Sequence, residues 1–365
     1  MSVPVLPRYS KGSLADIVPV LCGPPSASVP DWMPSAVAGA DRVVLLVLDG
    51  LGWNQFEAHR AHMPVLSGFA GGHITSVAPS TTATALTSIV TGTTPGEHGL
   101  IGYRVDMGDE VMNVLRWGNE NGDLRRRFVP EQVQPCPAFM GLSVPVVTKA
   151  EFEGTGFTAA HLSGSRRMGW RAPSSIPVIV RSAIEAGHPF VYAYYDGIDK
   201  IAHERGFGAY YESELRAADR LVGDVLAALP ADTVLLVTAD HGQVHVGDGT
   251  IIPVPDVLSH VQKQSGEGRF RWLHARRGRE SALLDACGMY RDVAWVVTRE
   301  KVLDEEWFGP RVPDSVVRRM GDVALVAHAP VSFDDPLDSG SFDLVCRHGS
   351  LTADEMLVPL LAARA

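Results

Sequence analysis

The chain has 365 residues, of which 45% are hydrophobic and 20% are charged, and this globular composition excludes an intrinsically disordered chain. Its formal net charge of −10, without a basic stripe, excludes a generic nucleic-acid-binding protein. Its apolar runs, such as residues 43–48, are far shorter than the roughly 20 residues that cross a bilayer, so we expect no membrane span.

The N-terminal region and the cysteines bear on where the protein is found. Residues 1–38 are rich in proline, show little periodicity and lack the charged start and long apolar run of a signal peptide. We interpret them as an arm that lies over the core. The four cysteines are scattered and form no C-x-x-C pair, which is typical of reduced thiols. These features favour a cytoplasmic protein.

Three apolar segments are predicted to form buried parallel strands. Residues 43–48, 190–195 and 233–238 are largely apolar, and an aspartate follows each of them closely. Residues 213–229 carry apolar side chains at about 3.6-residue spacing and are predicted to form a helix before the third strand. This alternation predicts an α/β fold with a mostly parallel central sheet and helices on both faces.

Residues 246–334 differ from the rest of the chain. Two segments typical of strands, 269–275 and 292–300, flank a segment typical of a helix, 278–288. We therefore predict a small inserted α/β lobe at 246–334. The core domain would then comprise residues 39–245 and 335–365.

Residues of metal-ligating types follow the predicted strands. Asp49 follows the first strand, Asp199 the second, and the pair Asp240 and His241 the third. Ligands of open α/β sheets bind beyond the carboxyl ends of the strands, so we expect these side chains to lie together. His203 is four residues after Asp199, and the two share one face if the segment is helical.

Two further residues leave alternatives open at this point. Asp196 is a competing ligand, and its position is equally typical of a residue that orients the metal ligands without binding the metal itself. His348 comes much later, shortly before a capping-box pattern formed by Thr352 and Glu355. Taken by itself, His348 is more typical of a loop histidine than of a metal ligand.

A threonine-rich segment begins another predicted helix. Pro79 and Ser80 lead into Thr81 and Thr82, and the apolar stretch that follows ends at Gly92. A threonine at a helix start commonly just caps the helix. The free N–H groups of a helix N-terminus also bind anions, and a bound metal can turn a hydroxyl into a nucleophile.

In this order, the motifs resemble the alkaline phosphatase superfamily, and within it the nucleotide pyrophosphatase/phosphodiesterase (type I phosphodiesterase) and phosphonoacetate hydrolase branch. The shared pattern is a strand-end aspartate, P-x-x-T, D-x-x-x-H, D-H-G and a late H-G. This chain supplies it with Asp49 and with residues 79–82, 199–203, 240–242 and 348–349. The resemblance implies an alkaline phosphatase-like fold over nearly the whole chain.

The resemblance also assigns the ligands of two zinc ions. One ion would be held by Asp49, Asp240 and His241, and the other by Asp199, His203 and His348. Thr82 falls at the position of the family's nucleophile, where it also contacts a metal, and Thr81 is the neighbouring candidate. Oxygen and imidazole ligands without thiolates suit zinc, with manganese or iron as alternatives.

The implied activity is hydrolysis of phosphodiester or pyrophosphate bonds in a small-molecule phosphoester, through a phosphothreonine intermediate. Two zinc ions and three carboxylates would leave one net positive charge, which matches the single charge of a diester. The sequence departs from the family at residues 83–85, where F-P-N is common, and at Tyr103, where the family has an asparagine.

Because of these departures, a phosphomonoesterase or a phosphonate hydrolase on the same scaffold remains an alternative. A non-catalytic metal-binding protein is a less favoured one. A sulfatase is disfavoured because the surroundings of Cys136 do not match its motif. The sequence indicates neither an oligomeric state nor a role for the 246–334 lobe.

Overall fold

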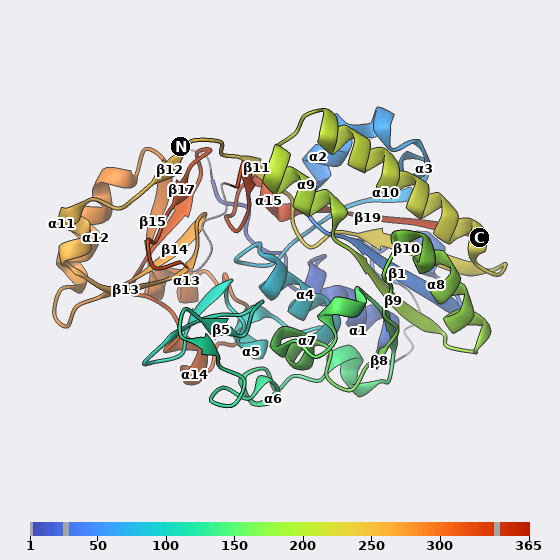
Figure 1. The fold of residues 1–365 in the computed structure, drawn as a ribbon, viewed down its shortest axis with the longest axis horizontal. Helices are drawn as coiled ribbons and strands as arrows, with labels where there is room; N and C mark the ends of the chain where they lie inside the picture. Colours follow the sequence, from blue (N-terminus) through green and yellow to red (C-terminus); the bar gives the residue numbers. More distant parts are fainter. Residues whose placement is uncertain (1–2, 25–28, 339–343) are drawn as a thin grey trace.

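The computed structural model describes residues 3–24, 29–338 and 344–365, which form two large β-sheets and two small two-stranded ones, with helices packed around them (Figure 1). The central sheet has seven strands. In spatial order they are β2 (Ala70–Thr75), β19 (Leu357–Arg364), β10 (Thr233–Thr238), β1 (Arg42–Leu48), β9 (Phe190–Tyr195), β7 (Pro145–Val147) and β8 (Arg166–Arg167).

The three strands predicted from apolar runs are confirmed as the neighbours β10, β1 and β9 at the centre of this sheet. They pair in parallel, with Leu45 opposite Leu236 on one side and opposite Tyr192 on the other. The sheet is mixed, because β19 runs antiparallel to both β10 and β2. The predicted α/β class is therefore confirmed, with one strand of opposite direction that the sequence analysis did not identify.

Helices pack against both faces of the central sheet (Figure 1). The helix predicted over 213–229 is α10 (Ala209–Ala228), which buries Leu215, Val222 and Val225. It lies with α8 (Ile176–Glu185) on one side of the sheet, and α4 (Thr82–Thr91) lies on the other. The remaining helices of the first two-thirds of the chain are α1 (Ile17–Cys22), α2 (Trp53–Ala58), α3 (Pro64–Ser67), α5 (Pro95–His98), α6 (Pro130–Val133), α7 (Gly156–His161) and α9 (Gly197–Arg205).

The second sheet has eight strands, and every neighbouring pair in it is antiparallel. In spatial order they are β15 (Ala294–Thr298), β16 (Val323–Ala327), β14 (Phe270–Ala275), β13 (Val261–Glu267), β3 (Arg104–Asp106), β4 (Val111–Asn113), β5 (Gly118–Asn119) and β6 (Gly122–Asp123). The sheet therefore joins residues 261–327 to residues 104–123. The division into an arm, a core and an inserted lobe stays a prediction.

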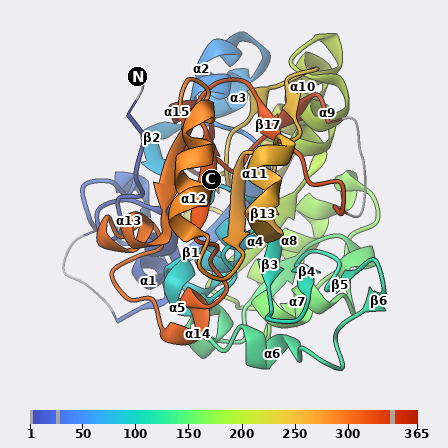
Figure 2. The same ribbon diagram turned by 90° about the vertical axis from the view of Figure 1, so that its left-hand side faces the viewer.

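The elements expected within 246–334 are present. Strands β14 and β15 flank α12 (Glu280–Cys287), and α12 and α11 (Pro255–Ser259) lie over one face of the second sheet (Figure 2). The other short elements are α13 (Arg299–Asp304), α14 (Asp314–Val317), α15 (Ala353–Met356), β11 (Val244–His245), β12 (Thr250–Ile251), β17 (Ser332–Phe333) and β18 (Cys346–Arg347). In the described part of the chain, no helix is both long and apolar enough to cross a bilayer.

Candidate metal centre and active site

The first predicted ligand set gathers beyond the ends of two neighbouring strands. Asp49 follows β1, and Asp240 and His241 follow β10, which pairs with β1 in parallel. His241 Nε2 lies 3.6 Å from Asp49 Oδ1 and 3.4 Å from Asp240 Oδ2. One ligand atom of each residue lies within 4.8 Å of the others. The structure thus brings these three residues into one buried cluster.

The second predicted set lies beside the first. Asp199 and His203 share one face of α9, with 3.2 Å between Asp199 Oδ1 and His203 Nε2. The same carboxylate oxygen lies 3.9 Å from His348 Nε2. The ring of His348 stacks on that of His241, with 3.5 Å between the ring centroids. A second group with ligand atoms within 4.8 Å consists of Asp199, His241 and His348, so His241 borders both clusters.

The three histidines present the same ring nitrogen to these clusters. Each has its Nδ1 within hydrogen-bond distance of a backbone carbonyl oxygen, in the pairs His241 with Gly242 (3.0 Å), His203 with Cys346 (2.6 Å) and His348 with Ser80 (3.0 Å). A carbonyl oxygen only accepts, so each Nδ1 carries the proton and donates it. Each Nε2 therefore keeps its lone pair for a metal, which is the usual arrangement of ligating histidines.

Two buried carboxylate oxygens support a cation at this place. Asp49 Oδ1 and Asp240 Oδ2 are buried without a hydrogen-bond partner among the described residues. Burial raises the pKa of both carboxyl groups, and the charges of Asp240 and Asp199 raise the pKa of Asp49 further. Such orphaned charges are costly in a protein interior unless a cation offsets them. The donor set of carboxylates and neutral imidazoles fits divalent zinc, manganese or iron.

Thr82 lies at the edge of the first cluster. It is the first residue of α4, with Thr81 as the N-cap residue, and its Oγ1 lies 3.1 Å from His241 Nε2. The first intrahelical hydrogen bond runs from Ala85 N to Thr81 O, so the N–H groups before Ala85 face the helix end. The Thr82 hydroxyl, a helix N-terminus and the predicted metal ligands thus meet at one point.

Asp196, left open by the sequence, lies outside both clusters. One of its carboxylate oxygens lies 2.7 Å from Lys149 Nζ and the other lies 2.7 Å from Lys200 Nζ. Burial lowers the pKa of Lys149, and the ion pair with Asp196 opposes that effect. Asp196 is therefore an ion-paired residue at the start of α9, beside the ligands.

Three residues that the sequence analysis did not single out contact the predicted ligands or Thr81. The Tyr194 hydroxyl donates a hydrogen bond to Asp49 Oδ2, and Gln243 Nε2 donates to Asp199 Oδ1 at 2.7 Å. Glu267, at the end of β13, lies beside the side chain of Thr81, and burial raises its pKa to about 8. Gln243 directly follows D-H-G, so its position is a usable sequence signal, whereas Glu267 comes from the second sheet and has none.

Tyr103, which the sequence analysis places at the position of the family's asparagine, lies directly before β3. Its side chain is half-buried, and burial raises the pKa of its hydroxyl. Asn113, on the neighbouring strand β4, lowers that pKa in part, and the backbone N–H of Val114 donates to Tyr103 O at 2.8 Å. The described contacts therefore tie Tyr103 to the second sheet.

Comparisons with known proteins identify the family of the chain and similar folds. The sequence model of the family described as type I phosphodiesterase/nucleotide pyrophosphatase matches residues 43–180 and 180–349. No curated protein sequence gives a significant match.

Solved structures with a similar fold include murine ectonucleotide pyrophosphatase/phosphodiesterase 5, in an inactive form in complex with AMP (13% identity, TM-score 0.65, 88% of this chain and 87% of that chain). The human protein of the same name shows 15% identity and a TM-score of 0.64 over 88% of this chain and 87% of that chain. Phosphonoacetate hydrolase from Sinorhizobium meliloti 1021, in complex with phosphonoformate, shows 18% identity and a TM-score of 0.64 over 89% of this chain and 90% of that chain. At identities of 13–18%, the similarity to these structures establishes the fold of this chain and nothing more.

Proposed function

The chain belongs to the type I phosphodiesterase/nucleotide pyrophosphatase family, and we propose that it is a two-metal hydrolase that cleaves phosphodiester or pyrophosphate bonds with Thr82 as nucleophile. The observation that carries this proposal is the position of the Thr82 hydroxyl. It lies at the N-terminus of α4 and 3.1 Å from His241 Nε2, within a cluster of buried carboxylates and imidazoles.

We assign the metal ligands as the sequence predicts them. Asp49, Asp240 and His241 would hold one ion, and Asp199, His203 and His348 would hold the other, with Thr82 beside the first. Bound divalent cations lower the pKa of a hydroxyl and offset the charge of phosphoryl oxygens. Zinc suits these oxygen and imidazole ligands best, with manganese or iron as alternatives.

The chain's own groups account for the remaining steps. The Thr82 hydroxyl loses its proton to solvent and Oγ1 attacks phosphorus, so that the bond from Oγ1 to phosphorus forms while the bond from phosphorus to the ester oxygen of the leaving group breaks. The N–H groups of the first turn of α4 point toward the place where phosphoryl oxygens would lie, and they stabilise negative charge there. Water then cleaves the phosphothreonine and restores the hydroxyl. The substrate in this proposal is a small-molecule phosphoester.

The test is a substrate panel measured with and without metal. We expect bis(4-nitrophenyl) phosphate to be hydrolysed faster than 4-nitrophenyl phosphate, with close to two metal ions per chain by elemental analysis. Chelation should abolish turnover, and added zinc should restore it. A faster reaction with the monoester would favour a phosphomonoesterase, and turnover of phosphonoacetate alone would favour a phosphonate hydrolase. Bound metal without turnover of any phosphoester would favour a non-catalytic metal-binding protein.

The ligand assignment has its own test. His203→Ala and His348→Ala should each weaken the same ion, because both imidazoles face Asp199. Metal content measured during stepwise chelation should show the loss of one ion in either variant. His188→Ala is the control, since His188 belongs to neither cluster. Loss of different ions in the two variants would contradict the assignment.

We also propose a cytoplasmic location. All four cysteines are free thiols, and burial raises the pKa of each of them. Their arrangement suits a reducing compartment.

A further inference from the structure

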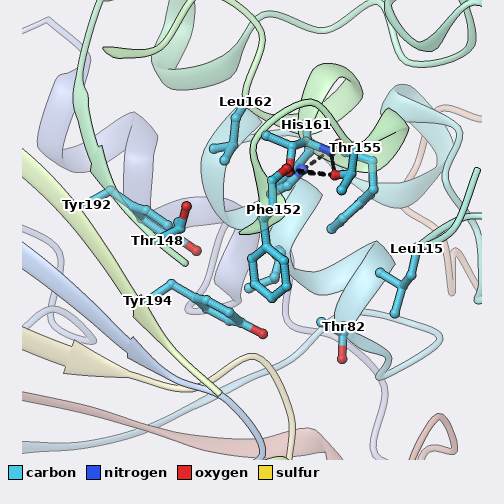
Figure 3. Close-up of a pocket in the computed structure, with 12 residues that line it drawn as sticks. Thr82, Leu115, Thr148, Phe152, Thr155, His161, Leu162, Tyr192 and Tyr194 are labelled. Atoms are coloured by element: carbon cyan, nitrogen blue, oxygen red, sulfur yellow. Dashed lines mark hydrogen bonds between the residues drawn. The ribbon is translucent and has the colours of Figure 1, made fainter. Parts of the chain in front are cut away.

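The three carboxylates of the candidate metal centre differ in how their oxygens are held. In Asp49 and Asp240, one oxygen has no hydrogen-bond partner among the described residues. The opposite oxygen accepts a hydrogen bond, from the Tyr194 hydroxyl in Asp49 and from Gly50 N (3.1 Å) in Asp240. Tyr194 and Thr82 lie at the same end of a cavity of about 140 Å³ that both residues line (Figure 3). These two carboxylates are thus oriented through one oxygen and offer the other to a metal.

Asp199 departs from this arrangement, because the oxygen that faces the histidines is also the one that accepts a hydrogen bond. Asp199 Oδ1 lies 3.2 Å from His203 Nε2 and 3.9 Å from His348 Nε2. Gln243 Nε2 donates to the same oxygen at 2.7 Å. Both imidazole nitrogens carry lone pairs, since each ring donates its Nδ1–H to a backbone carbonyl. Without a cation these lone pairs repel Asp199 Oδ1, whereas the Gln243 amide attracts it.

The surroundings of Gln243 fix the position of its amide. Gln243 is only 1% exposed, and its backbone oxygen accepts a hydrogen bond from Gln55 Nε2 at 2.7 Å. Gly50 lies against it, because a Cβ at Gly50 would be 2.7 Å from Gln243 Nε2 and 2.9 Å from Asp199 Cα. A flipped amide would place Gln243 Oε1 opposite the Asp199 carboxylate, where two acceptors repel each other. Gln243 therefore presents its N–H group to Asp199.

We infer that Gln243 is a positioning residue for the second metal ion, the one that Asp199, His203 and His348 would hold. Its amide keeps Asp199 Oδ1 in front of the two imidazoles before an ion arrives, so that less freedom is lost on binding. Because Gln243 directly follows the D-H-G motif, it connects the ligand segments of both ions. The inference rests on the proposed function, which assigns these residues as ligands.

The first experiment measures zinc binding without catalysis. The full-length protein is stripped of metal and titrated with Zn²⁺ in competition with a chromophoric chelator. Gln243→Met keeps an unbranched side chain of similar length but removes the N–H donor. We expect the dissociation constant of one ion to rise about 10- to 100-fold and that of the other to stay unchanged. Gln55→Met is the matched control, because it removes the donor to Gln243 O and leaves the amide facing Asp199, and it should change neither constant.

A second background identifies the ion that is affected. His203→Ala should remove the second ion and leave the first one bound. Adding Gln243→Met to His203→Ala should then leave the dissociation constant of the remaining ion unchanged. A further rise of that constant would show that Gln243 acts on the first ion and would overturn the inference. Equal effects of Gln55→Met and Gln243→Met would also overturn it, since the packing of the segment would then be responsible.

Turnover separates this inference from the proposed function. For Gln243→Met, kcat/KM for bis(4-nitrophenyl) phosphate should be low at limiting free Zn²⁺ and should recover as Zn²⁺ is raised, because the variant lacks affinity for an ion and retains the reacting groups. A loss that saturating Zn²⁺ does not restore would overturn the positioning role. Diester hydrolysis with zinc affinities that Gln243→Met does not change would overturn the inference and leave the proposed function intact. Weaker zinc binding in Gln243→Met, in a protein that hydrolyses no phosphoester, would support the inference and overturn the proposed function.

Discussion

Thr82 is the residue on which turnover should depend most. Thr82→Ala removes the hydroxyl that lies 3.1 Å from His241 Nε2 and that we propose as the nucleophile, and alanine suits the first turn of α4. We expect kcat/KM for bis(4-nitrophenyl) phosphate to fall about 10³-fold or more, with an unchanged circular dichroism spectrum. Thr81→Ala is the matched control, and it should retain far more activity. An inactive Thr81→Ala beside an active Thr82→Ala would move the nucleophile by one residue.

A buried histidine predicts how stability depends on pH. His98 is fully buried, its Nδ1 accepts from Leu100 N, and its Nε2–H therefore donates to Ser88 Oγ. Burial, followed by the charge of Arg319, lowers its pKa to about 3. The unfolded chain, with a histidine pKa of about 6.5, then binds more protons below that pH, so stability falls as the pH drops from about 6.5.

Between pH 7 and pH 5, the protonation of His98 in the unfolded chain should lower the free energy of unfolding by roughly 2 kcal/mol. The measurement is urea unfolding at both pH values, for the wild type and for His98→Gln. The variant should lose less stability on acidification by about that amount. Equal losses in the two proteins would show that His98 is not responsible.

At the scale of elements, the close approach of β13 to the segment after His348 depends on a glycine. Gly349 has a φ of +121°, and a Cβ there would lie 2.7 Å from Glu267 Cγ. The same segment pairs with Ser80, two residues before Thr82. Gly349→Ala should therefore push His348 and β13 apart and strain the backbone by about 1–3 kcal/mol. Because His348 is a proposed metal ligand, we expect both the metal content and the turnover to fall.

A control variant at a second glycine distinguishes the effect of the contact with Glu267 from the effect of backbone strain alone. Gly187 has a φ of +90°, and a Cβ there would meet nothing within 4 Å. Gly187→Ala should lower the unfolding temperature but leave the metal content and kcat/KM unchanged. Equal loss of metal from both variants would show that the contact with Glu267 does not hold His348 in place.

At the scale of the whole molecule, one buried ion pair connects the second sheet to α15. Arg269, just before β14, donates to Glu355 through Nε (2.7 Å) and Nη2 (2.8 Å), and both residues are fully buried. Glu355 also accepts from Ser350 N, two residues after His348. Removing one partner leaves the other charge buried and unpaired, so Glu355→Leu should cost about 3–5 kcal/mol of unfolding free energy.

A double-mutant cycle by urea unfolding checks this prediction. Arg269→Met combined with Glu355→Leu should cost clearly less than the sum of the two single changes, because the double variant has no unpaired charge. Strictly additive costs would mean that the pair does not couple the two parts of the molecule.

The sequence by itself determined the elements whose signal is local. The apolar runs of β1, β9 and β10 and the periodicity of α10 are recorded in consecutive residues, because a strand buried on both faces and an amphipathic helix each impose their own spacing. That these six side chains are candidate metal ligands was also predictable, since few residue types bind divalent cations and their order matches a known pattern. The structure brings all six side chains together, and their role as ligands stays a proposal.

Only the tertiary structure decided what depends on residues far apart in the chain. The antiparallel strand β19, the sheet that joins residues 104–123 to 261–327, and the ion pair between Lys149 and Asp196 leave no periodic trace in the sequence. The same holds for the approach of Glu267 to Gly349 and for the cavity beside Thr82. Each arises from the packing of side chains on separate elements, and a local pattern specifies which face of an element is buried but not which atoms it meets there.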